Sequence, residues 1–323
     1  MRMNYGVERG ILLGKLIQLL DGIEIRNFQQ DDMPLLGELY NSVNDRENAT
    51  FWWVGDSENW VNVFCAFENG KMVAKGQVEV FNIVPSGRST KSKHAIYLNL
   101  KPIPERESDL NLLELLYSYL FSRAKEIKES LSQEYATYLY VGNDASETIN
   151  SQFFIEQKGF RHSESLFTMK RDLKEPISDL PLNDEFHLTH WKMESSHEEG
   201  EYLELNAEVW PDTPLGVERL SQFKQNSLWT AIVVRDANTI VGSLMVWREE
   251  DKGIIEDVFV RDPWRNRGIA KYMLTQALSY LKSNELDSAE LMVLTTNESA
   301  LSLYSSVGFN KIKEEIRYGI ELG

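Results

Sequence analysis

Residues 254–272, which read IIEDVFVRDPWRNRGIAKY, decide the fold of this chain. They begin with an apolar run rich in β-branched residues, and this run predicts a strand that ends at Val260. Pro263 follows, then a short basic segment around Gly268, and a helical pattern begins after that glycine. The stretch therefore predicts a strand, a tight basic loop and a helix in that order.

This junction has the chemistry of an anion-binding site. The first turn of a helix leaves backbone N–H groups without internal partners and carries the positive end of the helix dipole. Gly268 lets a ligand approach the backbone closely, and Arg265 and Arg267 place positive charge where phosphate oxygens would lie. The segment is a candidate pyrophosphate loop, and an ordinary basic helix start is the alternative at this point.

The two common phosphate loops do not fit, because the chain has neither Gly-x-x-x-x-Gly-Lys-Ser/Thr nor Gly-x-Gly-x-x-Gly after a strand. The segment Arg265-x-x-Gly268-x-Ala270 resembles the acetyl-coenzyme A loop of the GNAT superfamily of N-acetyltransferases, Arg/Gln-x-x-Gly-x-Gly/Ala. Asn266 stands where the family frequently has glycine, which restricts the loop. The cofactor-binding residues that the resemblance implies here are Arg265, Asn266, Arg267, Gly268, Ile269 and Ala270.

A second match lies downstream, in residues 297–309 (NESALSLYSSVGF). This segment resembles the family element Asn-x-x-Ala-x-x-x-Tyr-x-x-x-Gly-Phe, in which the asparagine hydrogen-bonds the pantetheine or its neighbourhood and the tyrosine protonates the departing thiolate. The resemblance assigns these roles to Asn297 and Tyr304, and Ala300 shares the helix face of Tyr304. The alternative is that Tyr304 is a core residue of a short amphipathic helix.

Glu256 is the candidate base. A primary amine titrates at about pH 10 in water, so acetyl transfer needs a proton acceptor. In an alternating strand Glu256 and Val258 share one face and Asp257 and Phe259 the other. The run IEDVFV resembles the same strand of the spermidine/spermine N-acetyltransferases, whose first acid acts as the base. Asp257 stays open as a substitute base or an amine-binding partner, and a purely structural pairing of Glu256 with Arg265 is the other alternative.

The resemblance also places the oxyanion site on this strand. Backbone N–H groups near Val258 and Phe259 would polarise the thioester carbonyl if the strand carries the bulge that the family shows there. The cofactor-binding residues implied on the strand are Val258, Phe259 and Val260. Sequence alone cannot show a bulge, so this expectation depends on the structure.

The order of elements repeats once along the chain. Both halves read strand, helix, hairpin, strand, helix, strand, helix and a terminal strand or strands, and in each half the last helix ends in Gly-Phe. The predicted organisation is a helical preface (1–22), a first GNAT-like domain (23–172), a linker (173–184) and a second, catalytic domain (185–323). The predicted fold class is mixed α/β, with two tandem GNAT-like domains, each a twisted mixed sheet flanked by helices.

The first half lacks the residues that carry the resemblance. In place of the cofactor loop it has residues 101–109 (KPIPERESD), which are acidic and contain no glycine. When the halves are aligned on Gly-Phe, Ile155 falls at the position of Tyr304. We therefore interpret the first domain as a degenerate, cofactor-free copy.

Composition narrows the classes of function. The chain has 34 Lys and Arg against 50 Asp and Glu, and the net charge of −16 argues against binding nucleic acid through phosphates. The same charge is compatible with a cationic amine substrate, or it serves solubility alone. Cys65 is the single cysteine, so an internal disulfide and a cysteine metal site are excluded, and the five histidines have no metal spacing. No metal is expected.

The chain is expected to work in the cytoplasm, without a membrane. No apolar run approaches the roughly 20 residues that span a bilayer. Residues 11–20 (ILLGKLIQLL) are as apolar as a signal peptide, but acids follow them instead of a small-residue cleavage site, which favours a helix packed on the domain.

The predicted function is acetyl-coenzyme A-dependent N-acetyl transfer to the primary amine of a small cationic acceptor. Transfer is direct, in a ternary complex, with Glu256 as base and Tyr304 as acid. A protein or peptide amine is the alternative acceptor, and a non-catalytic acyl-coenzyme A-binding scaffold is the alternative class. The acceptor, the purpose of the first domain and the oligomeric state, monomer or homodimer, stay open.

Overall fold

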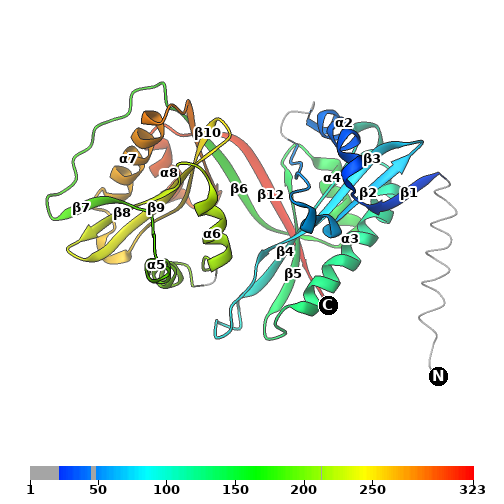
Figure 1. Cartoon of the computed structure of the whole chain (residues 1–323), viewed down its shortest axis with the longest axis horizontal. Coiled ribbons are helices and arrows are strands. Elements are labelled where there is room, and N and C mark those ends of the chain that lie inside the picture. The colour runs from blue at the N-terminus through cyan, green and yellow to red at the C-terminus, as the bar shows by residue number, and fades with distance from the viewer. Residues whose placement is uncertain (1–21, 45–48, 212) are drawn as a thin grey trace. The chain divides into compact units, whose positions relative to one another are not determined.

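The computed structural model describes residues 22–44, 49–211 and 213–323 (Figure 1). The helical preface predicted for residues 1–22 lies outside the described residues except for Gly22. The chain divides into two compact units, which we call unit 1 and unit 2. Unit 1 comprises the described residues up to Ser163 together with Ile316–Gly323, and unit 2 comprises Glu164–Glu315.

The two units are not consecutive pieces of the chain. Strand β6 (Arg161–Asp172) ends the first half, yet its residues from Leu166 onward pair antiparallel with β11 (Ser288–Leu294) of unit 2. Conversely, the last residues of β12 (Asn310–Glu321) belong to unit 1, where the Leu322 backbone N–H donates to the Thr137 carbonyl at 2.8 Å. Each unit thus contains part of the terminal strand of the other half, so the compact units differ from the ranges 23–172 and 185–323.

Unit 1 has one sheet with its main helix on one face. The strand order is β1-β2-β3-β4-β5 followed by the end of β12. The bounds are β1 Ile23–Asn27, β2 Val63–Glu68, β3 Lys71–Asn82, β4 Lys93–Pro102, β5 Ala136–Asp144, α2 Met33–Asn44, α3 Leu110–Ser130 and α4 Thr148–Gln152. The predicted hairpin turn is confirmed, because Asn69 and Gly70 both have positive φ between β2 and β3. The Asp109 carboxylate caps α3 by accepting from the Asn111 and Leu112 amides.

Unit 2 repeats the same order of elements. Its strands lie in the order β6-β11-β10-β9-β8-β7. The remaining bounds are β7 Phe186–Trp191, β8 Thr230–Asp236, β9 Thr239–Glu249, β10 Lys252–Val260, α5 Ser196–Val209, α6 Val217–Gln225, α7 Ile269–Ser283 and α8 Glu298–Ser306. In the first half a short 3-10 helix at Ser57–Asn62 stands where unit 2 has α6. The mixed α/β fold with a repeated unit is therefore confirmed.

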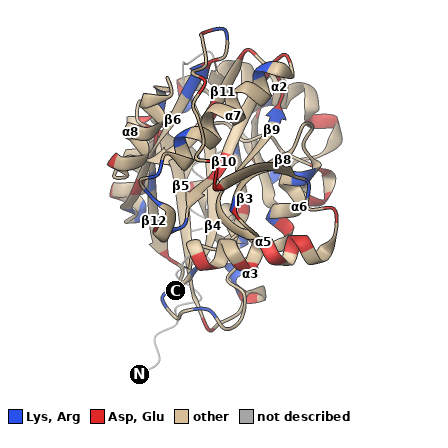
Figure 2. Cartoon of the chain, turned by 90° about the vertical axis from the view of Figure 1, so that its left-hand side faces the viewer, with Lys and Arg blue, Asp and Glu red and all other residues tan. Residues whose placement is uncertain are grey.

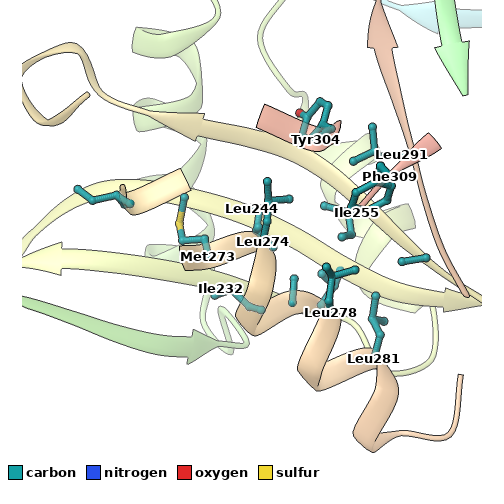
Figure 3. Packing of buried hydrophobic residues seen from close by; sticks show 14 of the residues in the cluster. Ile232, Leu244, Ile255, Met273, Leu274, Leu278, Leu281, Leu291, Tyr304 and Phe309 are labelled. Atoms are coloured by element: carbon teal, nitrogen blue, oxygen red, sulfur yellow. The ribbon is translucent and has the colours of Figure 1, made fainter. Parts of the chain in front are cut away.

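The sheet of unit 2 separates two apolar clusters. One contains buried residues of α7 and α8, such as Leu274, Leu278 and Tyr304, packed against the sheet (Figure 3). The other contains Tyr202 of α5 and Phe223 of α6. We call these the α7/α8 cluster and the α5/α6 cluster. Together they hold β10 between two packed layers, so the geometry of this strand is set from both faces.

Candidate active site

Strands β10 and β11 separate within unit 2. They pair in parallel at Lys252↔Ser288, Gly253↔Ala289 and Ile254↔Glu290, and no farther, although β10 continues to Val260 and β11 to Leu294. We call the segment beyond Ile254 and Glu290 the strand opening. It lies at the carboxyl ends of two adjacent parallel strands, the place where open α/β sheets bind ligands.

Strand β10 carries a bulge beside the strand opening. Glu256 pairs with Met245 of β9, and the next pair is Phe259 with Ser243, so β10 has one residue more than β9 over this interval. Asp257 lies in the left-handed region with φ of 54°. A bulge takes local backbone groups out of the ladder. The structure therefore has the bulge on which the expected oxyanion site depends.

The bulge also changes which face each side chain takes. Ile254 contacts the α5/α6 cluster and Val260 belongs to the α7/α8 cluster, although residues six apart on a regular strand share a face. The extra residue shifts the alternation by one. Strict alternation therefore does not hold from Ile254 to Val260, although Asp257, which contacts α5, and Phe259, which belongs to the α5/α6 cluster, lie on the same side as expected.

Asp257 is held by three donors from α5 and the residue after it. Its carboxylate accepts hydrogen bonds from the Tyr202 hydroxyl, from Asn206 Nδ2 at 2.8 Å and from Trp210 Nε1 at 2.8 Å. Burial raises the pKa of Asp257 above its ordinary value, although the three hydrogen bonds act in the opposite direction. Burial, together with the charge of Asp257, also raises the pKa of Tyr202. Both carboxylate oxygens of Asp257 are thus committed to protein donors.

Glu256 has a different environment. Its side chain is exposed, unlike the buried Ile255 before it. Its negative charge contributes to raising the pKa of Tyr202 on α5 and of Tyr304 on α8. An effect on both phenols places the Glu256 carboxylate within electrostatic reach of both helices. A solvent-accessible carboxylate at this position can exchange protons with water.

Tyr304 lies on α8 inside the α7/α8 cluster, with 7% of its surface exposed. Its ring meets Phe309 edge to face with centroids 6.1 Å apart, and Figure 3 shows both beside Leu291 of β11. Burial raises the pKa of Tyr304 to about 12, and the charge of Glu256 acts in the same direction. The phenol is therefore protonated at neutral pH and can donate a hydrogen bond.

Asn297 caps α8. Its Oδ1 accepts from the Ala300 amide at 3.2 Å and from the Ser299 hydroxyl at 3.0 Å. Because Oδ1 is used by the helix, a contact from Asn297 to a cofactor would use Nδ2. Ala300 packs at the edge of the α7/α8 cluster.

The arginines of the basic loop make hydrogen bonds and an ion pair with neighbouring residues of the same segment. Arg265 Nε donates to the Val260 carbonyl at 3.0 Å, and its guanidinium pairs with Asp262 at 2.8 Å. Arg267 NH2 donates to the Pro263 carbonyl at 3.3 Å. Asn266 has φ of 62°, which asparagine tolerates better than most residues, so the loop forms without the family's glycine.

The first turn of α7 is open to a ligand. Gly268 is the N-cap with φ of 79°, and no side chain in the described part of the chain caps this helix through a hydrogen bond. A Cβ placed on Gly268 would meet nothing within 4 Å. The turn therefore offers uncapped amides and free space, which fit the charge and bulk of a pyrophosphate.

The hydrogen-bond partners of Asp257 are not evident from the sequence. Tyr202, Asn206 and Trp210 lie 55, 51 and 47 residues from it in the chain. Their spacing of four residues puts them on one helix face. That spacing is the only signal the sequence carries, and it does not say which strand the face meets.

The corresponding strands of unit 1 stay paired over a longer stretch. Strands β4 and β5 pair continuously from Lys93↔Ala136 to Leu98↔Val141, six pairs against three in unit 2. The register of β3 with β4 runs without a shift from Ala74↔Pro102 to Val80↔Ile96. The unit 1 sheet therefore has no bulge where β10 has one, and β4 and β5 separate only beyond Leu98 and Val141.

A buried lysine fills the space where β4 and β5 of unit 1 end. Lys101 Nζ donates to Asn143 Oδ1 at 2.9 Å and pairs with Glu147. The cavity beside this pair has a volume of about 10 Å³, room for about one water molecule. Ile155, the counterpart of Tyr304, is 40% exposed.

The described residues were compared with the patterns of metal sites and membrane-spanning helices, and they fit neither. Within the described ranges, no group of three or more His, Cys, Asp or Glu side chains is arranged to hold a metal ion. None of the helices that the structure describes is long and apolar enough to cross a membrane.

Comparison with known proteins points to one family. Residues 189–309 match the Acetyltransferase (GNAT) family. The mycothiol acetyltransferase of Thermobispora bispora is 28% identical over 174 residues, which are 50% of this chain and 58% of that protein. The chain thus spans little more than half the length of this relative.

Solved structures share the fold. A GCN5-related N-acetyltransferase from Sphaerobacter thermophilus has a TM-score of 0.72 at 19% identity, covering 93% of this chain and 95% of that one. A tandem GNAT protein from the clavulanic acid biosynthesis pathway has a TM-score of 0.63 at 11% identity, covering 93% and 99%. At these identities the likeness concerns the fold, and it extends over both units.

Proposed function

Because residues 189–309 match the GNAT family of acetyltransferases, we propose that the chain is an acetyl-coenzyme A-dependent N-acetyltransferase with one working site, in unit 2. The observation that carries this proposal is the bulge of β10 at the point where β10 stops pairing with β11. The bulge frees backbone amides beside an opening between parallel strands, and such amides can stabilise a developing oxyanion. The unit 1 sheet has no bulge at the corresponding place.

The basic loop and the first turn of α7 would hold acetyl-coenzyme A. Acetyl-coenzyme A supplies the acetyl group as an activated thioester. The uncapped amides from Arg267 to Ala270 suit its pyrophosphate, and Gly268 leaves room for close approach. Arg265 keeps the loop in shape through Val260 and adds positive charge. The amides near Val258 and Phe259 would polarise the thioester carbonyl.

Glu256 is the proposed base. It takes up the proton that the acceptor nitrogen loses as the new C–N bond forms, directly or through a water molecule. Its exposure is compatible with this role, because water can reach the carboxylate and carry the proton away. Asp257 is less suited, because three protein donors occupy its carboxylate.

Tyr304 is the proposed acid, and its pKa limits how it acts. The C–S bond breaks as the C–N bond forms, and the sulfur leaves as a thiolate whose thiol has a pKa of roughly 8.5. A phenol with a pKa of about 12 is a weaker acid than this thiol. Tyr304 therefore stabilises the leaving thiolate mainly by donating a hydrogen bond. The proton that the sulfur finally takes up comes from solvent.

A small cationic amine is the proposed acceptor. The net charge of the chain is −16, and α5, which borders the β10 bulge, is rich in acids that appear red in Figure 2. These acids are Glu198, Glu199, Glu201, Glu204 and Glu208. Glu199 pairs with Lys224 and Glu208 with Arg261, so the attraction for cations comes from the net charge and from the other acids of the helix.

Thiol release from acetyl-coenzyme A tests the proposal. The acceptor panel is spermidine, kanamycin, glucosamine and a peptide with a free N-terminal amine, and isothermal titration counts the acetyl-coenzyme A sites. We expect one site per chain and amine-dependent turnover with spermidine or kanamycin. Turnover with the peptide alone would favour the protein acceptor. Binding without turnover would favour the scaffold, and two sites per chain would contradict a single site in unit 2.

A further inference from the structure

Unit 2 has a cavity of about 260 Å³ that is lined by none of the proposed catalytic or cofactor-binding residues. Its walls are α7, the end of α8 and residues 176–178, and we call it the 176–178 cavity. Pockets that take drug-sized ligands have volumes of roughly 300–1,000 Å³. The 176–178 cavity is slightly smaller, which suits a small metabolite.

The wall formed by residues 176–178 is held in place by the rest of unit 2. Residues 173–184 are predicted as a linker, yet the Pro176 carbonyl accepts from Arg171 NH2 at 2.8 Å and Ile177 packs against the α7/α8 cluster. Just before this wall, the Glu175 carbonyl accepts from Lys282 Nζ of α7 at 3.4 Å. These contacts preform the cavity, as is usual for sites that bind small molecules.

Two cationic side chains line the cavity. Arg171 of β6 is 5% exposed, and its guanidinium pairs with Glu175, but its Nε is buried without a hydrogen-bond partner among the described residues. This Nε lies beside Gly308, another lining residue, because a Cβ placed on Gly308 would be 2.6 Å from it. Buried N–H groups without a partner are rare in native structures. The Nε of Arg171 is therefore a donor available to a ligand.

Lys271 supplies the charge that Arg171 does not. Glu175 offsets the charge of Arg171, whereas Lys271 makes no hydrogen bond or ion pair with any residue that the structure describes. An unpaired ammonium and a buried guanidinium N–H in one cavity suit an anion with several acceptor oxygens. Phosphate is such an anion.

The remaining lining suits a ligand that also carries hydroxyl groups. Ser178 and Ser305 contribute hydroxyls, and Leu278 and Val307 contribute apolar surface. The end of α8 adds backbone carbonyls, because the final carbonyls of a helix have no partner within it. Carbonyl oxygens repel an anion but accept hydrogen bonds from alcohols. A ligand with one anionic end and a polyol body matches all of these groups.

We propose that the 176–178 cavity binds a small phosphorylated sugar or polyol, at a site separate from the acetyl-coenzyme A site. The phosphate pairs with Lys271 and accepts from the Nε of Arg171, and the ligand hydroxyls meet the serines and the carbonyls at the end of α8. This ligand is neither the acetyl acceptor nor the cofactor, so the site goes beyond the N-acetyl transfer proposed above.

Isothermal titration with glucose 6-phosphate tests the site in the whole chain saturated with coenzyme A, which keeps the cofactor loop occupied. We expect one glucose 6-phosphate site per chain. Glucose should bind at least about tenfold more weakly, because it lacks the group that makes charge-assisted hydrogen bonds. Inorganic phosphate should also bind more weakly, because it lacks the polyol. No binding of glucose 6-phosphate up to about 10 mM, or equal affinity for inorganic phosphate, would overturn the proposal.

Lys271→Met and Lys282→Met are matched variants, because each removes one positive charge from α7. Lys271 lines the cavity, whereas Lys282 contacts a carbonyl outside it. We expect the Kd for glucose 6-phosphate to rise about tenfold in Lys271→Met and to stay within about twofold in Lys282→Met. Equal changes in both variants would reduce the effect to net charge and contradict the site.

Ser178→Trp blocks the cavity from its exposed wall. Ser178 is exposed, so the larger side chain can enter the cavity without displacing core residues. We expect this variant to lose glucose 6-phosphate binding. Retained binding would place the ligand elsewhere and contradict the proposal.

Dephospho-coenzyme A separates this site from the cofactor site, because it lacks the 3′-phosphate of coenzyme A. We expect the ratio of the Kd values of the two compounds to be the same in Lys271→Met as in the wild type. If Lys271→Met weakens coenzyme A alone, the cavity holds the 3′-phosphate of the cofactor and the proposal is wrong. If coenzyme A does not bind at all, the proposed transfer function fails, and glucose 6-phosphate titrated into the free protein still tests the cavity.

Discussion

Replacing Tyr304 with phenylalanine removes one hydroxyl from the α7/α8 cluster and keeps the ring. The ring stays against Phe309, so the free energy of unfolding should change little. A hydrogen bond to a charged group contributes about 1.5–3 kcal/mol. If that hydroxyl stabilises the leaving thiolate, its loss lowers kcat by about 10- to 150-fold. The Kd for acetyl-coenzyme A should stay within about twofold, because the interaction forms as the sulfur leaves.

The assay measures thiol release at saturating amine, with acetyl-coenzyme A affinity followed by isothermal titration. Tyr280→Phe serves as the control. Tyr280 lies on α7, and its hydroxyl donates to the Leu228 carbonyl at 3.0 Å, so this variant also loses one phenol hydrogen bond in unit 2. We expect its kcat to match the wild type. A Tyr304→Phe enzyme with wild-type kcat would refute the acid assignment.

Other predictions concern the base, the cofactor loop and unit 1. Glu256→Gln should lower kcat/KM most at low pH, where deprotonating the amine is hardest; a pH profile parallel to the wild type would argue against the base assignment. Gly268→Ala should weaken acetyl-coenzyme A binding about tenfold by calorimetry, because φ of 79° costs a residue with a Cβ about 1–2 kcal/mol. Lys101→Met should destabilise the fold by about 3–5 kcal/mol in chemical denaturation, because it leaves the Glu147 side chain, which is 11% exposed, without its cation, and adding Glu147→Leu should recover part of that loss. Burial lowers the pKa of Lys75 from 10.5 to about 7, so the unfolded chain binds more protons between these values, and stability should rise with pH across this window; Lys75→Met should flatten that rise.

Much of the cofactor side of the candidate site follows from local sequence. The strand, the basic loop and α7 lie where residues 254–272 predict them, and Gly268 takes the left-handed N-cap position. Gly308 likewise follows α8 with positive φ. These features depend on backbone conformation and on hydrogen bonds between near neighbours, which a few residues specify by themselves. The resemblance to the family rests on such local segments.

The different environments of Glu256 and Asp257 could not be predicted from the residues next to them in the sequence. Alternation along a strand assumes a regular ladder, and the bulge between Glu256 and Phe259 breaks it. The three donors to Asp257 come from a helix about 50 residues earlier in the chain. The burial and hydrogen bonding of a side chain depend on which element packs over it, so the distinction between Asp257 and Glu256 emerges only in the fold.

By itself, then, the sequence determined the repeated order of elements, the uncapped glycine turn of α7 and the helix that carries Tyr304, because short-range periodicity and capping specify them. Only the tertiary structure decided that β6 pairs in unit 2 and that the end of β12 lies in unit 1. It also decided that Lys101 fills the unit 1 sheet end and that α5 anchors the β10 bulge. These outcomes depend on pairing between distant segments, which stabilises a particular partner only when the whole core is assembled.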